Sequence, residues 1–541
     1  MIPTSNEVAD QAVSSRPASL KKGQKTLADR LEESPGLYLF IFTVVYAVGM
    51  TANNARRNLW IDELFTTYLA DLPSLSQIWP LIAKGIELNP PLPFWLTWIV
   101  HHTLGEGEVL TRLPATIGFW VMCVCLFYFV RRRSDAVHGF IALLLPLFTF
   151  TANDGTFARG YGLLLGFSGI ALLGWQFAAE GVRRPLAIAG LAFGIAGAVS
   201  SHYYGVYIAA ALFVGELLRA RSNKRFDFPI AASIAIGLSP LIAYLPLIRM
   251  AKKSLPTFWA DPLADLLYET YADLLGPITI VLFLFLLQTI SRSKEGPNIV
   301  RWMPATIKLH ETAVCGLLIL MPLAVYAAAI LDKAAFYPRY VQPVVLGFAI
   351  LGALFAFRIG GGNPLFRKTA IEVLVWLCLT PWCFWQGAKV VFLARPGAYF
   401  LSKINFTTAP DLPLVIDNDS DFMSIYHYAT PKMRERLFML DDAAAAVKYR
   451  GSDTGMRSLE IGQTFHELHV VDYRKFVESH REFLVVRTRP ASWMIQALMA
   501  DGAQVELVDY RKGRGTTVDE SLMFKIRVPE RSSANLVDLR R

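Results

Sequence analysis

The sequence predicts an α-helical polytopic membrane protein with a small α/β domain at its C-terminal end. Of its 541 residues, 54% are hydrophobic and only 18% are charged, whereas soluble globular proteins are near 25% charged. The apolar residues fall in runs of about 17 to 25, long enough as helices to cross a hydrocarbon core of about 30 Å. From about residue 395 these runs give way to short strand-like segments. A soluble multidomain enzyme and a disordered chain are excluded.

The cysteines and the net charge exclude further classes. Every cysteine falls in an apolar stretch, so the sequence indicates no disulfide framework, and no Cys/His spacing typical of zinc is found. The net charge of +9 would suit a nucleic-acid partner, but cationic residues in a membrane protein first report topology. We therefore expect no nucleic acid. The cysteines are Cys123, Cys125, Cys315, Cys378 and Cys383.

We expect about eleven transmembrane helices, the first of them a retained signal anchor after the polar residues 1–35. The segment 89–105 is apolar but short and begins with two prolines, which favours an interfacial helix in the first outer loop. With this helix flat, basic residues are about twice as numerous in the inner loops as in the outer ones, which predicts an inner N-terminus and an outer C-terminus. The expected spans are 37–53, 113–130, 137–152, 161–179, 186–201, 203–219, 228–248, 274–291, 311–331, 340–357 and 370–393.

Three regions follow: a cytoplasmic tail (1–35), a membrane domain (36–394) and an outer domain (395–541). In the last region, helical patterns such as ASWMIQALMADG separate five short apolar segments. Strands alternating with helices are typical of a small α/β domain. The five strand-like segments are PLVIDN, RLFML, EFLVV, QVELVDY and LMFKIRV.

The first outer loop carries two adjacent acids, Asp62 and Glu63, directly after the first span. Partial desolvation at a membrane surface raises the pKa of a carboxyl group toward that of a useful general base. Two acids in the first turn of a helix are also explained by the helix macrodipole alone.

Other polar residues lie at the outer ends of the expected spans. Three of them are arginines, which run against the charge bias and cost free energy there unless an anion is near. A lipid phosphate is such an anion, and each charge-assisted contact would contribute about 1.5–3 kcal/mol; the alternative for a single arginine is snorkelling to headgroups. The arginines are Arg112, Arg159 and Arg339, and the remaining candidates are Asn89, Asp154, Tyr161, His202, Tyr203, Tyr204, Tyr337 and Tyr340.

One outer loop stays without an assignment. Arg249, Lys252 and Lys253 precede the acids Asp261 and Asp265 in a polar stretch before the eighth expected span. The stretch suits a lid over a lipid site, but a solvated loop is the favoured interpretation.

The order of these motifs resembles the membrane-embedded GT-C glycosyltransferases. An outer Asp-Glu is followed by PPL, by RLPA opening one span, by ARGY opening another, and later by HYYG and PRYVQP. The nearest branch is family 39, the protein O-mannosyltransferases and the bacterial aminoarabinose and galacturonic acid transferases acting on lipid A. The resemblance covers roughly residues 37–360.

The resemblance implies a GT-C fold and a sugar donor linked to polyprenyl phosphate, transferred on the outer face with inversion at the anomeric carbon. Asp62 then matches the catalytic base, Glu63 supports it, and Arg112, Arg159 and Arg339 hold the donor phosphate. The expected location is the bacterial inner membrane. The expected acceptor is an envelope molecule, which means lipid A, a glycan, a lipid or a protein.

The sequence also departs from the family pattern. Asn89 stands where relatives often have histidine, and an amide cannot shuttle protons near neutral pH. Phe157 replaces a glutamate before ARGY, with Asp154 as a nearby substitute acid. Some relatives bind a divalent metal, and Asp62, Glu63, Asp154 and His202 offer ligands without a spacing that fixes geometry.

Two other functional classes compete with the enzyme. A transporter or flippase of a polyprenyl-linked glycan would use the same arginines, but transporters commonly show internal repeats and ionisable residues at mid-span. The sequence shows no internal repeat, and its polar candidates lie at one membrane surface instead of at mid-span. A membrane-anchored assembly or sensing protein would place its function in 395–541 and be indifferent to Asp62.

Overall fold

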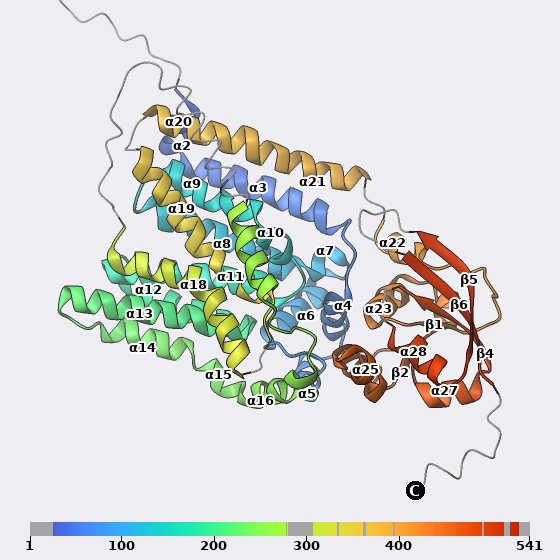
Figure 1. The fold of residues 1–541 in the computed structure, drawn as a ribbon. Coiled ribbons are helices and arrows are strands. Elements are labelled where there is room, and N and C mark those ends of the chain that lie inside the picture. The colour runs from blue at the N-terminus through green and yellow to red at the C-terminus, as the bar shows by residue number, and fades with distance from the viewer. Residues whose placement is uncertain are drawn as a thin grey trace, which may run out of the picture.

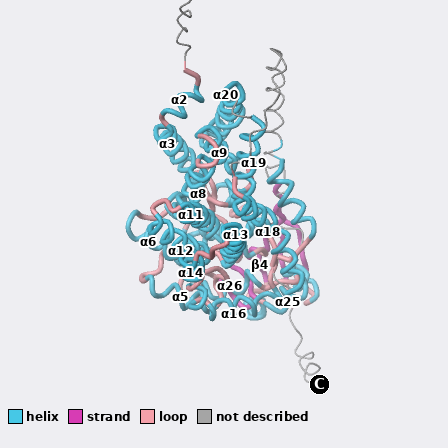
Figure 2. Tube along the Cα trace, turned by 90° about the vertical axis from the view of Figure 1, so that its left-hand side faces the viewer, coloured by secondary structure: helices cyan, strands magenta, loops and turns pink. Residues whose placement is uncertain are grey.

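The computed structural model describes residues 25–276, 279, 307–332, 335–360, 364–392, 395–488, 492–512 and 520–529. A bundle of helices forms most of the molecule, and a region of strands and short helices lies at one end of it (Figure 1). The view along the bundle in Figure 2 places the helices in front of the strands, which confirms that the mixed region sits beyond one end.

Among the described residues, six helices are long and apolar enough to cross a membrane, or seven if a bent pair forms one span. A helix of 18 residues or more reaches about 27 Å. Two shorter apolar stretches, Ala136–Phe148 and Val344–Arg358, also occupy expected spans. The six are α3 (Pro35–Asn54), α8 (Leu113–Arg131), α11 (Gly160–Glu180), α12 (Arg184–Ser201), η3 with α13 (Tyr203–Asn223) and α18 (Leu309–Asp332).

The bent pair replaces the single span expected at 228–248. It consists of α14 (Phe228–Gly237) with α15 (Pro240–Ala243), followed by α16 (Leu245–Ser254) with η4 (Leu255–Thr257), and the two halves meet at 62°. Pro240 and Pro246 lie at the break, and proline both removes a helical hydrogen bond and displaces the preceding turn. The expected single helix is therefore divided into two helices that meet at a sharp bend.

The other expected spans are met in different ways. The run 137–152 is split into α9 (Ala136–Leu144), η2 (Leu145–Phe148) and α10 (Thr151–Asp154), while 340–357 begins with η6 (Pro338–Val341) and continues as α19 (Val344–Gly360). The run 370–393 is helical through α20 (Pro364–Val373), η7 (Leu374–Leu379) and α21 (Thr380–Phe392). The span expected at 274–291 lies almost entirely outside the described residues, so the count of eleven stays a prediction.

Between α3 and α8 the chain forms a cluster of short helices. They are α4 (Ile61–Ala70), η1 (Leu75–Gln77), α5 (Ile78–Lys84), α6 (Leu92–Leu104) and α7 (Glu108–Thr111). The 13 residues of α6 give a length of about 20 Å, too short to cross the hydrocarbon core. This length supports the interfacial helix expected at 89–105.

Glycines allow the central helices of the bundle to approach closely. A Cβ atom at Gly162 of α11 would lie 2.2 Å from the carbonyl oxygen of Ala115 in α8, and one at Gly118 would lie 2.4 Å from the carbonyl oxygen of Gly162. Only residues without a side chain fit such a crossing, a device common where helices pack inside membranes.

Ion pairs close the end of the bundle away from the strands. Glu32 in α2 (Leu27–Glu33) accepts hydrogen bonds from the first two amides of α9 and pairs with Arg367 of α20 at 2.8 Å. Arg133 at the end of α8 pairs with Glu180 and Glu311. These ion pairs hold the ends of several described helices together.

The C-terminal region is a six-stranded mixed sheet in the order β3-β2-β1-β4-β6-β5, with β1 to β4 parallel and β5 and β6 antiparallel. All five expected strand segments form strands, and α28 (Trp493–Ala500) occupies the expected helix. The strands are β1 (Leu414–Ile416), β2 (Leu437–Asp441), β3 (Val470–Asp472), β4 (Glu482–Arg487), β5 (Gln504–Lys512) and β6 (Glu520–Arg527). The other helices are α22 (Ala398–Ser402), α23 (Asp419–Tyr428), α24 (Pro431–Arg434), α25 (Ala443–Arg450), α26 (Thr454–Gly462) and α27 (Tyr473–Ser479).

The sheet region is joined to the first loop by hydrogen bonds. The Tyr428 hydroxyl accepts from the amide of Leu59 at 3.0 Å and donates to Glu108 at 3.3 Å. Ser458 Oγ donates to the carbonyl of Ile86 at 3.1 Å. Their hydrophobic residues also form one continuous core. The region thus supports the helices between α3 and α8.

The carboxyl group of Asp417, directly after β1, makes the stability of this region depend on pH. Burial raises its pKa to about 7, although Ser492 and the amide of Thr488 hydrogen-bond to it. The folded state therefore holds a proton that the unfolded state has lost above pH 4, and stability falls as pH rises from about 4 to about 7. We expect Asp417→Asn to flatten this slope. Scanning calorimetry between pH 5 and 8 measures it; an unchanged slope would contradict the assignment, and exposed Asp261→Asn is the control.

Candidate active site

Asp62 and Glu63 occupy the first turn of α4, where their side chains enter different surroundings. Consecutive residues of a helix are about 100° apart. Glu63 is 0% exposed and accepts hydrogen bonds from Arg112 Nε at 2.7 Å, Arg112 Nη2 at 2.6 Å and the amide of Ala158 at 2.8 Å. Burial opposes its ionisation, but the Arg112 guanidinium outweighs burial and holds the pKa of Glu63 below its ordinary value.

The guanidinium of Arg112 donates all of its observed hydrogen bonds to groups of the protein. It is 0% exposed, and besides Glu63 it donates to the carbonyls of Asn54 at 3.1 Å, Arg57 at 2.7 Å and Asn58 at 2.7 Å. These contacts join the end of α3, the start of α4 and the start of α8. The geometry therefore gives Arg112 a structural partner instead of the phosphate expected from the sequence.

Asp62 faces Arg339, which comes from η6, far along the chain. The distance between Asp62 Oδ2 and Arg339 Nη2 is 3.9 Å, and the two side chains are 29% and 11% exposed. Aromatic rings surround the guanidinium: Trp60 and Tyr337 have centroids 4.8 Å away, and Trp259 lies at 5.1 Å. Within the described residues Arg339 makes no hydrogen bond, and its buried Nε has no partner.

Arg159, at the start of α11, is paired differently. It forms a bidentate ion pair with buried Glu87, with one N···O distance of 2.8 Å, and donates to the backbone carbonyl of Asp62 at 3.1 Å. The amide of Asn89 also hydrogen-bonds to Glu87. The sequence analysis missed Glu87, although an acid two residues before Asn-Pro-Pro was a usable signal.

Asp154 and Arg57 extend the charged cluster. Burial raises the pKa of Asp154 to about 6 despite the nearby positive charges of Arg339 and Arg57. Arg57 donates to Asn153 Oδ1 at 3.1 Å and to the carbonyl of Thr156 at 2.9 Å. Burial and the neighbouring Arg112 lower the pKa of Arg57 to about 9. Arg57 was not among the residues selected from the sequence.

Aromatic side chains surround His202, next to the charged cluster. His202 lies between Tyr161 at 5.7 Å, Tyr340 at 5.6 Å and Tyr204 at 5.1 Å, measured between ring centroids. Burial, with the charge of Arg159, lowers the pKa of His202 to about 3, so its ring is neutral. Of the two tyrosines that follow, Tyr204 contacts this ring, whereas Tyr203 packs with the core beneath the first loop.

The described residues do not bring together three His, Cys, Asp or Glu side chains in an arrangement that holds a metal ion. Of the four ligands considered, Glu63 is taken by Arg112 and His202 Nδ1 accepts from the amide of Tyr204 at 3.2 Å. The donor set does not fit a metal centre.

Residues 88–245 match the family profile described as dolichyl-phosphate-mannose-protein mannosyltransferase. Over this segment the chain is similar to the membrane glycosyltransferases of that family. The match confirms the resemblance found from the sequence motifs, and it contains Asn89, Arg112, Asp154, Arg159 and His202. A sequence comparison with curated proteins finds no match.

Solved structures confirm the fold. ArnT from Cupriavidus metallidurans in the apo state has a TM-score of 0.56 at 12% identity, over 91% of this chain and 98% of that one. The same protein bound to undecaprenyl phosphate gives a TM-score of 0.53 at 12% identity, over 90% and 98%. The glycosyltransferase family and this fold favour an enzyme over the transporter and the assembly protein.

The buried ion pair between Glu63 and Arg112 should contribute strongly to the stability of the protein, whereas Asp62, which precedes Glu63, should not. We expect Glu63→Gln to lower the free energy of unfolding by about 3–5 kcal/mol, because it leaves the Arg112 charge buried without a counter-ion. Asp62→Asn, a matched change one residue away, should alter it by less than about 1 kcal/mol. Thermal unfolding in detergent measures both, and equal effects would contradict this division of roles.

Proposed function

We propose that the chain transfers a sugar from a polyprenyl-phosphate-linked donor to a hydroxyl group of an envelope acceptor, with Asp62 as general base and inversion at the anomeric carbon. One observation carries the proposal: a partly exposed carboxylate, Asp62, lies 3.9 Å from the guanidinium of Arg339, which has no hydrogen bond within the described part of the chain. A candidate base, Asp62, and a candidate anion-binding group, Arg339, thus lie side by side.

Arg339 is the best candidate for the donor phosphate. A buried guanidinium without hydrogen-bond acceptors is costly, and a phosphate that accepts from it removes that cost. Arg159 lies on the same side of Asp62 but is paired with Glu87, so it acts as a second, weaker contact. The binding of undecaprenyl phosphate by the ArnT of similar fold supports this type of donor.

The reaction follows from the two groups. Asp62 accepts the proton of the acceptor hydroxyl, and the oxygen attacks the anomeric carbon from the face opposite the phosphate. The bond from that carbon to the phosphate oxygen breaks, and its electron pair leaves with the phosphate. The positive charge of Arg339 stabilises the negative charge that develops there, as electrostatic preorganisation requires.

The surrounding residues position these groups. Glu63 and Arg112 fix the first turn of α4 and so direct Asp62 toward Arg339. The sugar is bound by polar and aromatic side chains, namely Asn89, Tyr161, His202 and Tyr337. The sequence suggested Tyr203 as a further sugar contact, but Tyr204 is the tyrosine whose ring contacts His202. The site around Asp62 and Arg339 lies at the periplasmic face of a bacterial inner membrane. The region 395–541 is then periplasmic and the N-terminus is cytoplasmic.

Asp62→Asn should abolish transfer while leaving the protein folded. Loss of a general base lowers a rate by about 10²–10⁴-fold. The measurement is the composition of envelope glycans, lipids and glycoproteins in wild-type, deletion and Asp62→Asn strains, with exposed Asp261→Asn as the control. The deletion and Asp62→Asn should lack the same sugar.

Arg339→Gln should reduce transfer by about 10²–10³-fold, the range for losing one group that stabilises a developing negative charge. The same compositional measurement applies, with protein in the membrane quantified by immunoblot. If Asp62→Asn and Arg339→Gln both retain wild-type sugar content while the deletion loses it, the proposed site is wrong.

A further inference from the structure

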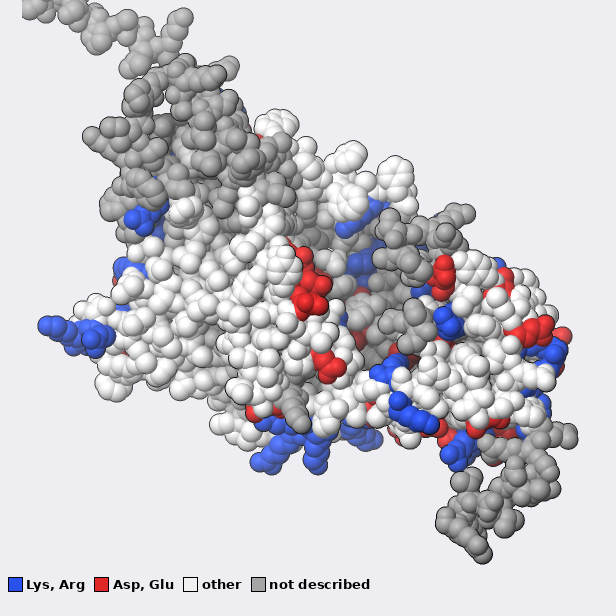
Figure 3. Space-filling view, viewed as in Figure 1, with Lys and Arg blue, Asp and Glu red and all other residues white. Residues whose placement is uncertain are grey.

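Five cations that the proposed reaction does not use gather on one surface. Arg249, Lys252 and Lys253 lie on α16, Lys84 ends α5, and Arg457 lies on α26. We refer to these five as the α16 basic surface. Figure 3 shows the blue side chains along the lower edge of the molecule, where α16 lies in Figure 1.

These charges are largely unneutralised. Arg249, Lys252 and Lys253 are spaced i, i+3 and i+4, so they share one helix face, and all three are exposed. In the described part of the chain no carboxylate lies within 4.0 Å of these three or of Lys84. Only Arg457 has an acid partner, Asp453 at 3.1 Å. Cations held together in this way repel one another and attract an anion.

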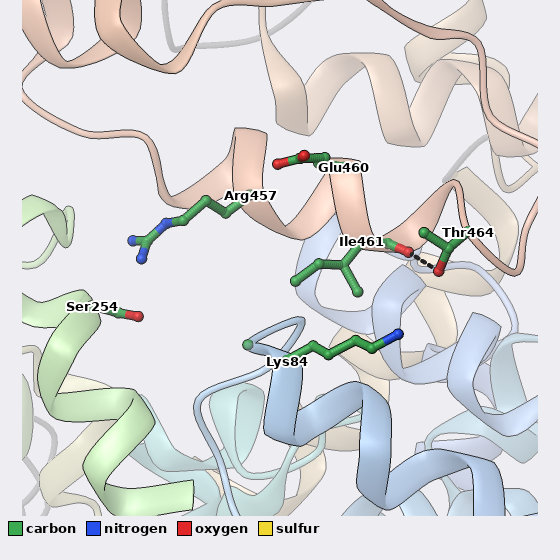
Figure 4. A pocket seen from close by; sticks show the side chains of 7 residues that line it. Lys84, Ser254, Arg457, Glu460, Ile461 and Thr464 are labelled. Atoms are coloured by element: carbon green, nitrogen blue, oxygen red, sulfur yellow. Dashed lines mark hydrogen bonds between the residues drawn. The ribbon is translucent and has the colours of Figure 1, made fainter.

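A cavity of about 320 Å³ opens beside this surface, between the first-loop helices and the sheet region. In Figure 4, Arg457 extends toward Ser254 across the cavity, while Lys84 runs along its floor toward Thr464. The Nε atom of Arg457 is buried without a hydrogen-bond partner. Glu460 is the only acid in the lining, which also contains two cations and two hydroxyl groups, from Lys84, Arg457, Ser254 and Thr464.

The α16 basic surface lies where a membrane meets water. The helix pair bends by 62° into α16, and the exposed apolar residues Ile242 and Leu245 lie at the bend (72% and 45% exposed). Leu247 of α16 is buried against the protein. An amphipathic basic helix next to exposed apolar residues is typical of the headgroup layer, where the available anions are lipid phosphates.

The same surface adjoins the proposed reaction site. Gly85 follows Lys84 with φ +102°, a left-handed conformation that glycine adopts without strain. Two residues later, Glu87 pairs with Arg159, which in turn contacts the backbone of Asp62. Three residues span at most about 10 Å. A headgroup on the surface therefore lies near enough for its glycan to enter the site.

We propose that the α16 basic surface and its cavity bind the phosphate headgroup of a lipid-linked acceptor and hold the accepting hydroxyl toward Asp62. This inference rests on the proposed function. Its substrate class is an anionic, phosphate-bearing lipid rather than a protein or a neutral glycan.

Binding of short-chain phosphatidic acid to the purified full-length protein tests the proposal without requiring catalysis. The variant is Lys84→Gln with Lys252→Gln and Lys253→Gln. The matched control removes three exposed lysines of the sheet region by Lys432→Gln, Lys448→Gln and Lys475→Gln, which gives the same change in net charge. Phosphatidylcholine of equal chain length and inorganic phosphate are the comparison ligands.

We expect the triple variant to bind phosphatidic acid at least tenfold more weakly than the wild type, and the control variant to match the wild type. Inorganic phosphate should bind far more weakly than phosphatidic acid. Equal affinity in the triple variant and the wild type would overturn the site, and equal affinity for phosphate and phosphatidic acid would overturn its assignment to a lipid. Asp62→Asn should bind phosphatidic acid normally, so failure of binding and failure of catalysis are distinguished.

Discussion

The buried ion pair between Glu63 and Arg112 is the constraint on which the proposed site depends. Two charges without access to water are tolerated only when each is paired and hydrogen-bonded. Arg112 meets this requirement through Glu63 and three backbone carbonyls, and Glu63 through Arg112 and the amide of Ala158. These bonds fix the chain before α4 and the start of α8. They also orient the first turn of α4 so that Asp62, the preceding residue, faces Arg339 instead of Arg112.

The pairing of the three outer arginines then distinguishes their roles. Arg112 is neutralised by Glu63, and Arg159 by Glu87. Among the described residues, the carboxylate that pairs with Arg339 is Asp62 at 3.9 Å, and the aromatic rings contact the faces of the guanidinium without accepting a hydrogen bond in its plane. A phosphate would fill that plane. We therefore propose that Arg339, the arginine that the sequence ranked as the third contact, is the main contact of the donor phosphate.

The sequence predicted the elements that local pattern determines. Apolar runs located the long helices, and short alternating segments located five of six strands. Arg112 was assigned to a phosphate because its partner, Glu63, is 49 residues away, and pairing over that distance is set by packing. Glu87 was missed for the same reason. The bend between Ala243 and Leu245 was missed because the apolar run is continuous, although Pro240 and Pro246 lie on either side of it.

Phe157 stands where the family pattern has an acid, so the negative charge near Arg57 and Arg339 must come from another residue. The Phe157 ring contacts Arg57, whose Cζ lies 4.5 Å from the ring centroid, and packs on Trp60 at 5.6 Å. Arg57 thus makes a cation–π contact with the residue that replaces the expected acid. The missing negative charge is supplied three residues earlier by Asp154, which interacts with both Arg57 and Arg339. Because the pKa of Asp154 is about 6, this charge is present at neutral pH and is lost in mild acid. The positive charge of Arg339 is therefore balanced by both Asp62 and Asp154 above that pH and by Asp62 alone below it, so its attraction for a donor phosphate should increase when Asp154 is protonated.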